Sequence, residues 1–280
     1  MRWRGGREST NVEDNRGGSG KKVALGGGIG AIIIVIISLI TGKDLSGILQ
    51  FLDGGNQFTQ SQPLSPGAND STSQMVRVVL GSTEDVWSKI FQDGGSTYTE
   101  PALRMFTHSE QSACGGAAAE MGPFYCPADQ KIYIDLSFCN ELRTRFKTPG
   151  NFAIAYVVAH EVGHHVQNLL GISEQVQKMR GRLSEADYNK LSVKLELQAD
   201  FLAGVWAYHE RQTTGMIEPG DLETALSAAS AIGDDKLQQE AQGYVVPDAF
   251  THGTSKQRMY WFKKGFTTGD MSQGKFENIN

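Results

Sequence analysis

Two histidines and a glutamate at a fixed spacing carry the most specific chemistry in this sequence. His160, Glu161 and His164 form the pattern H-E-x-x-H within residues 151–170, an apolar run of helical length. On a helix, positions i and i+4 lie one above the other, so both imidazoles face one point and can share one Zn²⁺ ion. Glu161 would then be placed to take a proton from a water at that ion. The alternative is a surface helix with incidental histidines, which the apolar setting disfavours.

A third ligand must come from elsewhere in the chain, because a catalytic zinc usually has three protein ligands and one water. The run E-L-Q-A-D, residues 196–200, lies in a second predicted helix that begins at Ser184. Glu196 would supply the third ligand. Asp200, one turn further on the same face, could accept the free N–H of a ligating histidine. Without H-E-x-x-H, both carboxylates would be interpreted as a solvated acidic face.

The other histidines carry weaker signals. His165 points about 100° away from the second ligand on the same helix, so we interpret it as a neighbour of the site. His209 lies more than three turns beyond the third ligand and is expected to be structural. His252 stands in a loop just before a predicted helix, where it could either donate to an oxyanion or make a structural hydrogen bond. His108 receives no assignment.

Three cysteines make an odd number, so an oxidising compartment would allow one disulfide and leave one thiol. Cys114 and Cys126 flank a loop rich in glycine and alanine and are the expected pair. Cys139 is expected to be a buried thiol. A cysteine-based zinc site is the alternative, and the absence of C-x-x-C spacing disfavours it.

Charge and hydropathy divide the chain. The net charge is −5, but residues 1–22 carry six basic and three acidic side chains, which leaves 20 basic and 28 acidic side chains in the rest. An acidic body does not favour nucleic acid as a partner. Residues 23–41 contain no charge and are about long enough to cross a bilayer as one helix. A cleaved signal peptide and a buried core helix are the alternatives; the absence of a nearby cleavage site and the uniform Ile/Val run favour an uncleaved anchor.

These features predict four segments. Residues 1–22 would be a basic tail in the cytoplasm, because the positive side of a single-pass anchor faces inward. Residues 23–41 would be the transmembrane anchor, and residues 42–74, rich in Gly, Ser, Pro, Asn and Gln, a flexible linker. Residues 75–280 would form the folded domain outside.

The pattern within residues 75–280 predicts an α+β fold that is mainly helical, with a small sheet ahead of the H-E-x-x-H helix. Further helices are expected at residues 75–92, 184–211, 221–242 and 256–266, and strands at 103–108, 124–126 and 131–136. The strand around Tyr133 is expected to hold a peptide substrate by adding it as a further strand. The helix at 221–242 is expected to supply packing and little chemistry.

Several long motifs in order carry a family resemblance. They are MRWRGGRESTNVEDNRG, the glycine-rich apolar stretch, GPFYCPADQKIYIDLSF, HEVGHHVQ, ELQADFLAGVW and THGTSKQRMYWFKKGF. Over nearly its whole length the chain resembles the bacterial family called putative neutral zinc metallopeptidases, which are membrane-anchored. The resemblance implies a zincin-like domain and a location at the bacterial inner membrane, with the domain periplasmic or extracellular.

A wider resemblance assigns roles. H-E-x-x-H, a downstream E-x-x-A-D and a later Thr-His segment are similar to the gluzincin membrane peptidases. There the two histidines and the downstream glutamate bind one zinc, and the glutamate of the motif is the base. By this resemblance, His252 would polarise the substrate and Arg258 would buttress the site. Gly253 stands where those relatives commonly have proline.

The sequence therefore predicts a zinc endopeptidase that acts on a protein or peptide substrate. Two alternatives remain: an anchored domain in which zinc holds helices together and a partner is recruited, and an inactive peptidase fold serving as a scaffold. A binding domain would complete its zinc with a fourth protein ligand. No other residue is as plausible a ligand as His160, His164 and Glu196, which favours catalysis.

Overall fold

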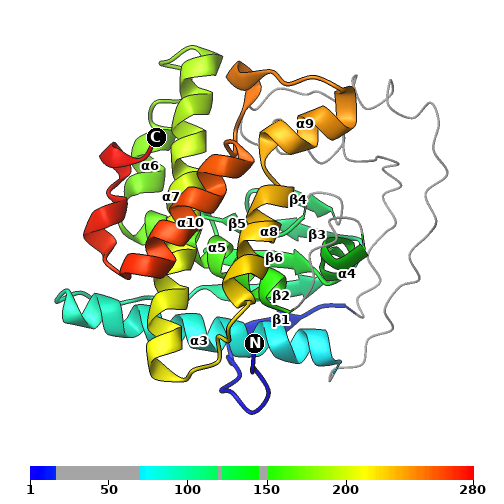
Figure 1. The fold of residues 1–280 in the computed structure, drawn as a ribbon, viewed down its shortest axis with the longest axis vertical. Helices are drawn as coiled ribbons and strands as arrows, with labels where there is room; N and C mark the ends of the chain where they lie inside the picture. Colours follow the sequence, from blue (N-terminus) through cyan, green and yellow to red (C-terminus); the bar gives the residue numbers. More distant parts are fainter. Residues whose placement is uncertain (17–69, 119–121, 145–150) are drawn as a thin grey trace.

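The computed structural model describes residues 1–16, 70–118, 122–144 and 151–280 (Figure 1). Their fold is α+β and mainly helical, as predicted. The predicted anchor at residues 23–41 lies outside the described residues, as does most of the predicted linker. Among the described residues, no helix is both long enough and apolar enough to span a membrane.

The described helices fall into long and short ones. The long helices are α3 (Ser71–Asp93), α5 (Phe152–Leu169), α7 (Glu185–Thr213) and α10 (Ser255–Thr268). The shorter helices are α4 (Ser137–Thr144), α6 (Ile172–Gln177), α8 (Asp221–Ala231) and α9 (Asp234–Gln242), followed by the 3-10 turns η2 (Pro247–Ala249), η3 (Met271–Gly274) and η4 (Phe276–Asn278).

A four-stranded sheet lies against these helices in the order β1-β2-β6-β5. Its strands are β1 (Val12–Asp14), β2 (Ala102–Phe106), β5 (Phe124–Cys126) and β6 (Lys131–Asp135). β1, β2 and β6 are parallel, and β5 runs antiparallel to β6. Tyr133 belongs to β6, which is paired on both sides, so the expectation that this strand receives a substrate strand is wrong. β5 is the edge on that side of the sheet.

A small hairpin, β3 (Ser109–Ser112) with β4 (Gly115–Ala118), is joined to the main sheet by a disulfide. The disulfide links Cys114 in the hairpin turn to Cys126 in β5, with 5.8 Å between the Cα atoms, and it is the pairing expected from the sequence. Cys139 is buried in α4, outside this disulfide.

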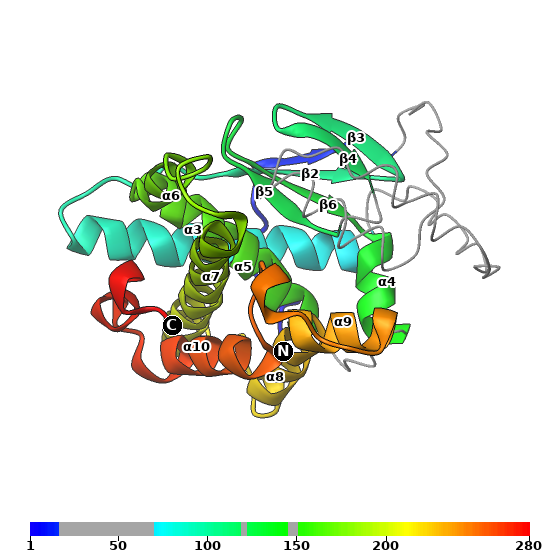
Figure 2. The same ribbon diagram turned by 90° about the horizontal axis from the view of Figure 1, so that it is seen from above.

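Helix α5 runs through the centre of the molecule, which explains its apolar sequence. It lies between the sheet and α8 and α10 (Figure 2) and also packs against α3 and α7. Nearly all its side chains are buried, including Phe152, Tyr156 and Val162. A helix covered on all sides must be hydrophobic all round. The polar groups that it does contain therefore require buried partners.

Residues 1–16 belong to this fold, contrary to the prediction of a separate tail over residues 1–22. β1 pairs in register with β2, with Val12 opposite Leu103, and Trp3 is buried in the main core. The domain also begins earlier than predicted. Helix α3 starts at Ser71, because the side chain of Asp70 caps it by accepting from the N–H groups of the first turn.

The predicted helix at residues 221–242 is two helices, α8 and α9, which is a second correction. Gly233 lies at the break, and a Cβ there would come within 2.4 Å of the backbone nitrogen of Ser255. Gly233 has an extended backbone, with φ −73° and ψ 142°, so the helix ends before it. α9 starts afresh with Asp234 as its first residue.

Candidate metal centre

Helices α5 and α7 cross at the H-E-x-x-H turn, and a glycine sets how closely they approach. A Cβ on Gly163 would lie 2.9 Å from the carbonyl oxygen of Ala199 and 3.1 Å from its Cα. Such contacts are closer than side chains tolerate, so glycine at this position lets the two backbones touch. This contact brings Glu196, one turn before Ala199 on α7, within reach of the histidines on α5.

The three predicted ligands lie together. Nε2 of His160 is 3.1 Å from Oε2 of Glu196, and Nε2 of His164 is 3.4 Å from Oε1 of the same carboxylate. One potential ligand atom from each residue can be chosen so that all three lie within 4.8 Å of one another. Two imidazole nitrogens and a carboxylate oxygen are the donor set of many catalytic zinc sites. The described residues therefore fit a single Zn²⁺ ion.

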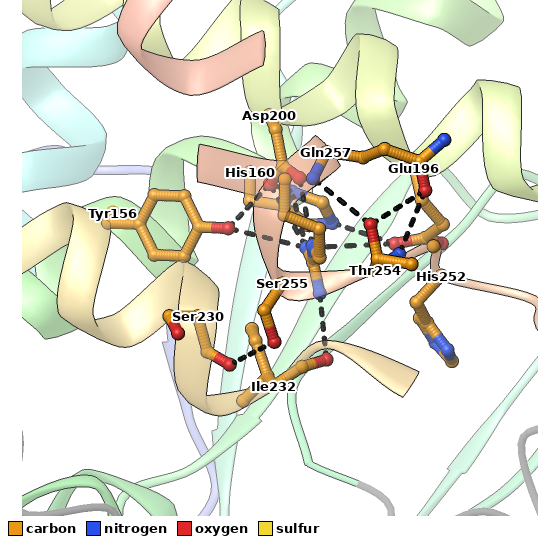
Figure 3. A network of polar contacts seen from close by, with 12 residues as sticks. Tyr156, His160, Glu196, Asp200, Ser230, Ile232, His252, Thr254, Ser255 and Gln257 are labelled. Carbon is orange, nitrogen blue, oxygen red and sulfur yellow. Dashed lines mark hydrogen bonds and ion pairs between the residues drawn. The ribbon is translucent and has the colours of Figure 1, made fainter. Parts of the chain in front are cut away.

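Asp200 holds the first histidine. Its Oδ1 lies 2.9 Å from Nδ1 of His160, and the hydroxyl of Tyr156 donates to the same oxygen (Figure 3). Arg258 donates from Nε to Oδ2 at 2.8 Å and from Nη2 to Oδ1 at 3.0 Å. Asp200 has no exposed surface, and the Arg258 side chain is 2% exposed, so this ion pair is fully buried. With Nδ1–H donated to the aspartate, Nε2 of His160 carries the lone pair that faces the metal position.

Gln167 plays the same part for the second histidine, and the sequence analysis did not identify it. Its Oε1 lies 2.9 Å from Nδ1 of His164. Its amide nitrogen donates to the carbonyl of Leu195 at 2.6 Å and to the side chain of Gln198 at 3.1 Å, which fixes which way the amide faces. The signal was present: Gln167 is three residues after His164, on the same helix face.

The charges in this cluster are arranged around a cation. Burial alone would lower the pKa of His160, but Asp200 and Glu196 raise it to about 10. Burial would raise the pKa of Glu196, but the neighbouring histidines hold it well below its ordinary value. The carboxylates of Asp200 and Glu196 are thus both kept ionised in a buried site. Two buried negative charges require a positive partner, which is either a protonated imidazole or a metal ion.

Glu161 differs from the other carboxylates of the site. It is 7% exposed, and burial raises its pKa. Within the described part of the chain, its carboxylate has no hydrogen-bond partner, so both oxygens are available to a water. A buried carboxylate with a raised pKa and free lone pairs has the properties of a general base.

His252 lies in a loop beside the turn of α7 that carries Glu196. Gly253 has a φ of 87°, and a Cβ there would lie 3.1 Å from Val193 and 3.2 Å from Leu197. The loop therefore packs directly on α7. The charges of His252 and Glu196 each shift the pKa of the other. His252 is thus close to the metal cluster without joining it.

Asp234, the first residue of α9, anchors that loop. Its Oδ2 accepts from the backbone N–H groups of Thr251 at 2.7 Å, His252 at 2.6 Å and Gly253 at 3.1 Å. Its Oδ1 lies 3.1 Å from Nδ1 of His252. Burial would raise the pKa of Asp234, but the charge of His252 and these hydrogen bonds lower it. Sequence reasoning missed this residue because it treated residues 221–242 as one helix, although Gly233-Asp234-Asp235 is a typical helix start.

The remaining histidines make structural contacts. His165 is fully buried, with Nε2 2.6 Å from the carbonyl of Thr99 and Nδ1 3.0 Å from the hydroxyl of Tyr125 in β5. His209 lies 3.0 Å from the carbonyl of Gly269. His108 adopts a φ of 69° in the turn before β3, and its backbone N–H donates to Asp135.

Comparisons with known proteins agree with this cluster. A family model described as "Putative neutral zinc metallopeptidase" matches residues 1–276. "Uncharacterized protein YpfJ" of Escherichia coli (strain K12) is 47% identical to this chain over 98% of the chain and 97% of its own length. "Uncharacterized protein Rv2575" of Mycobacterium tuberculosis is 40% identical over 83% of the chain and 82% of its own length. No solved structure matches the chain significantly.

Proposed function

Because the chain belongs to the family of putative neutral zinc metallopeptidases, we propose that it is a zinc-dependent endopeptidase. One observation carries the proposal. His160, His164 and Glu196 converge on one point, while Glu161, which shares a helix with the histidines, keeps both carboxylate oxygens available. A purely structural zinc would be enclosed by four ligands, whereas the described residues supply three around this point.

Each residue has a definite part in the proposed reaction. Zinc bound by the three ligands would polarise the scissile carbonyl and lower the pKa of a bound water toward ~7. Glu161 accepts a proton from the attacking water and returns it to the departing amine. His252, oriented by Asp234, donates to the oxygen on which negative charge develops. Asp200 and Gln167 keep the ligand histidines in the required tautomer and orientation.

The free edge of β5 is the better candidate for binding a peptide backbone. Among the described residues, β5 pairs with β6 alone, and the side chain of Tyr125 in its centre contacts α5. Nδ1 of His165 lies 3.0 Å from the Tyr125 hydroxyl, and Asn168 donates to the same hydroxyl at 3.2 Å. An extended peptide added to this edge would run beside the helix that carries the ligands.

The disulfide and the sequence together support a location outside the cytoplasm. Disulfides such as Cys114–Cys126 persist in oxidising compartments and are rare in the cytosol. We place the substrates, which are proteins or peptides, in the same compartment. Residues 23–41 would attach the enzyme to the inner membrane of a bacterium.

The decisive experiment compares the zinc-loaded full-length protein with its Glu161→Gln variant. Wild type should cleave an unfolded protein such as casein, and the variant should not, while both bind one zinc. A Glu174→Gln variant, changed at an exposed site on α6, is the matched control and should cleave normally. Cleavage by Glu161→Gln at the wild-type rate would refute its role as base. Zinc binding without cleavage by any of the three would instead favour a zinc-stabilised binding domain.

A further inference from the structure

The domain is built to receive its own N-terminal segment, residues 1–16. Glu84 on α3 is 1% exposed, and three side chains of that segment satisfy it. Ser9 donates to Oε1 at 2.5 Å, Asn11 donates to Oε1 at 2.9 Å, and Arg7 donates to Oε2 at 2.9 Å. Within the described residues, these are the only hydrogen bonds to this carboxylate. Removal of the segment would take away all three partners of this carboxylate at once.

The backbone of the segment fits the domain equally closely. A Cβ on Gly81 of α3 would lie 2.6 Å from the carbonyl oxygen of Arg7, so glycine there lets the segment lie directly on the helix. The N–H of Ser9 donates to the carbonyl of Arg77 at 3.0 Å. Further along, Leu103 donates to Asn11 at 2.8 Å as β1 joins the sheet. The segment is therefore held along its length by both a helix and a strand.

The two ends that flank residues 17–69 are joined to each other. Arg16 has a side chain only 3% exposed, and it forms ion pairs with Asp14 at the end of β1 and with Asp70 at the start of α3. Figure 1 shows the end of β1 beside the start of α3. Whatever lies between residues 16 and 70 thus leaves and re-enters the fold at one place on its surface.

The pairing of these two ends limits how the chain can cross a membrane. A helix that spans a bilayer once separates its two flanks by the ~30 Å of hydrocarbon. Paired strands such as β1 and β2 lie only ~4.8 Å apart. A single crossing between residues 16 and 70 is therefore incompatible with β1 paired to β2 and with Arg16 paired to Asp70.

We propose that residues 1–16 lie on the same side of the membrane as the metal centre, and that the protein meets a lipid bilayer from that side only. This replaces the single-pass arrangement with a cytoplasmic N-terminus. The disulfide assigns both parts to the outside. The proposal does not depend on peptidase activity.

The test labels the full-length protein in intact bacterial spheroplasts with a membrane-impermeant maleimide. Glu8→Cys reports on the N-terminal segment and Glu240→Cys, on α9, reports on the domain; both positions are exposed. The native cysteines should not react with the maleimide, because two form the disulfide and the third is buried. We expect both variants to be labelled to the same extent before lysis.

A second variant separates shielding by lipid from a position across the membrane. Glu13 and Arg104 are opposite each other in the β1–β2 pair, so the double variant Glu13→Cys/Arg104→Cys should form a disulfide in the cell, and either single variant should not. Labelling of Glu240→Cys alone, together with no crosslink, would overturn the proposal and restore a single crossing. A crosslink without labelling of Glu8→Cys would support docking with the segment covered by lipid. Two variants that stay unlabelled until lysis, with no crosslink in the double variant, would assign both parts to the reducing cytoplasm and overturn the proposed compartment.

Discussion

The buried pair of Asp200 and Arg258 allows stability and zinc binding to be separated. In Asp200→Asn, one side-chain oxygen can still accept from His160 and Tyr156. The new amide nitrogen faces Nε of Arg258, which now lies 2.8 Å from a donor in place of an acceptor. Because Arg258 is buried and its charge is left without this partner, we expect the zinc-free protein to lose about 3–5 kcal/mol of unfolding free energy.

Zinc affinity should fall as well, for a different reason. The carboxylate that polarises His160 becomes a neutral amide, and loss of such a partner typically weakens metal binding about 10- to 100-fold, equivalent to roughly 1.4–2.8 kcal/mol. The free energy of unfolding is measured by denaturant titration without metal, since bound zinc would add its own stabilisation. Zinc affinity is measured by competition with a chelator.

The control is Arg258→Met in the Asp200→Asn background. It removes the stranded cation and fills its volume with an apolar chain, so much of the lost stability should return, while zinc affinity stays low. An Asp200→Asn protein that unfolds at the wild-type denaturant concentration would refute the electrostatic account of this pair. Recovery of zinc affinity in the double variant would show that Asp200 acts on the metal through Arg258 and not through His160.

Three further predictions concern the supports of the site. Gly163→Ala should push α5 away from α7 and lower the free energy of unfolding by about 1–3 kcal/mol. It should also weaken zinc binding, as measured by chelator competition. Unchanged zinc affinity would mean that the approach of α7 does not set the ligand geometry. Reduction of Cys114–Cys126 should lower the free energy of unfolding by about 2–4 kcal/mol, seen as an earlier denaturation midpoint, and an unmoved midpoint would contradict this. In the folded protein the pKa of Asp234 lies below its ordinary 3.8, so the stability that its charge contributes is lost as pH falls through that lowered value. The pKa of His252 lies above 6.5, so the stability that its charge contributes is lost as pH rises through the raised value. The stability difference between wild type and Asp234→Asn should therefore be largest between about pH 4 and 6.5, and a difference that does not vary with pH would refute the ion pair.

Local patterns in the sequence predicted the local parts of the site. H-E-x-x-H fixed two histidines one turn apart, and the apolar run around them indicated a buried helix, as α5 is. Glu196 and Asp200 were placed on one face of a second helix by the same spacing rule, and both lie against His160. The spacing of Cys114 and Cys126 around a short loop also led to the observed disulfide.

What the sequence did not predict depends on pairings between distant segments. Hydrophobic periodicity favours α8 and α9 as one helix and outweighed the local helix-start signal at Gly233. The contact of Gly233 with Ser255, which brings α9 to the start of α10, is a pairing that periodicity does not reveal. The strand around Tyr133 has the composition of a substrate-binding edge, but an edge exists only relative to neighbours, and β2 and β5 occupy both sides.

The N-terminal segment is the clearest case of this limit. Its basic residues, followed by an apolar stretch, predict a cytoplasmic tail by a rule that considers charge alone. In the fold, the same residues are individual ion-pair partners: Arg7 is matched to Glu84 and Arg16 to Asp70. Net charge cannot distinguish a solvated tail from a docked strand, because the distinction lies in acidic partners more than fifty residues away. A topology derived from charge bias must therefore be checked against strand pairing, which cannot cross a bilayer.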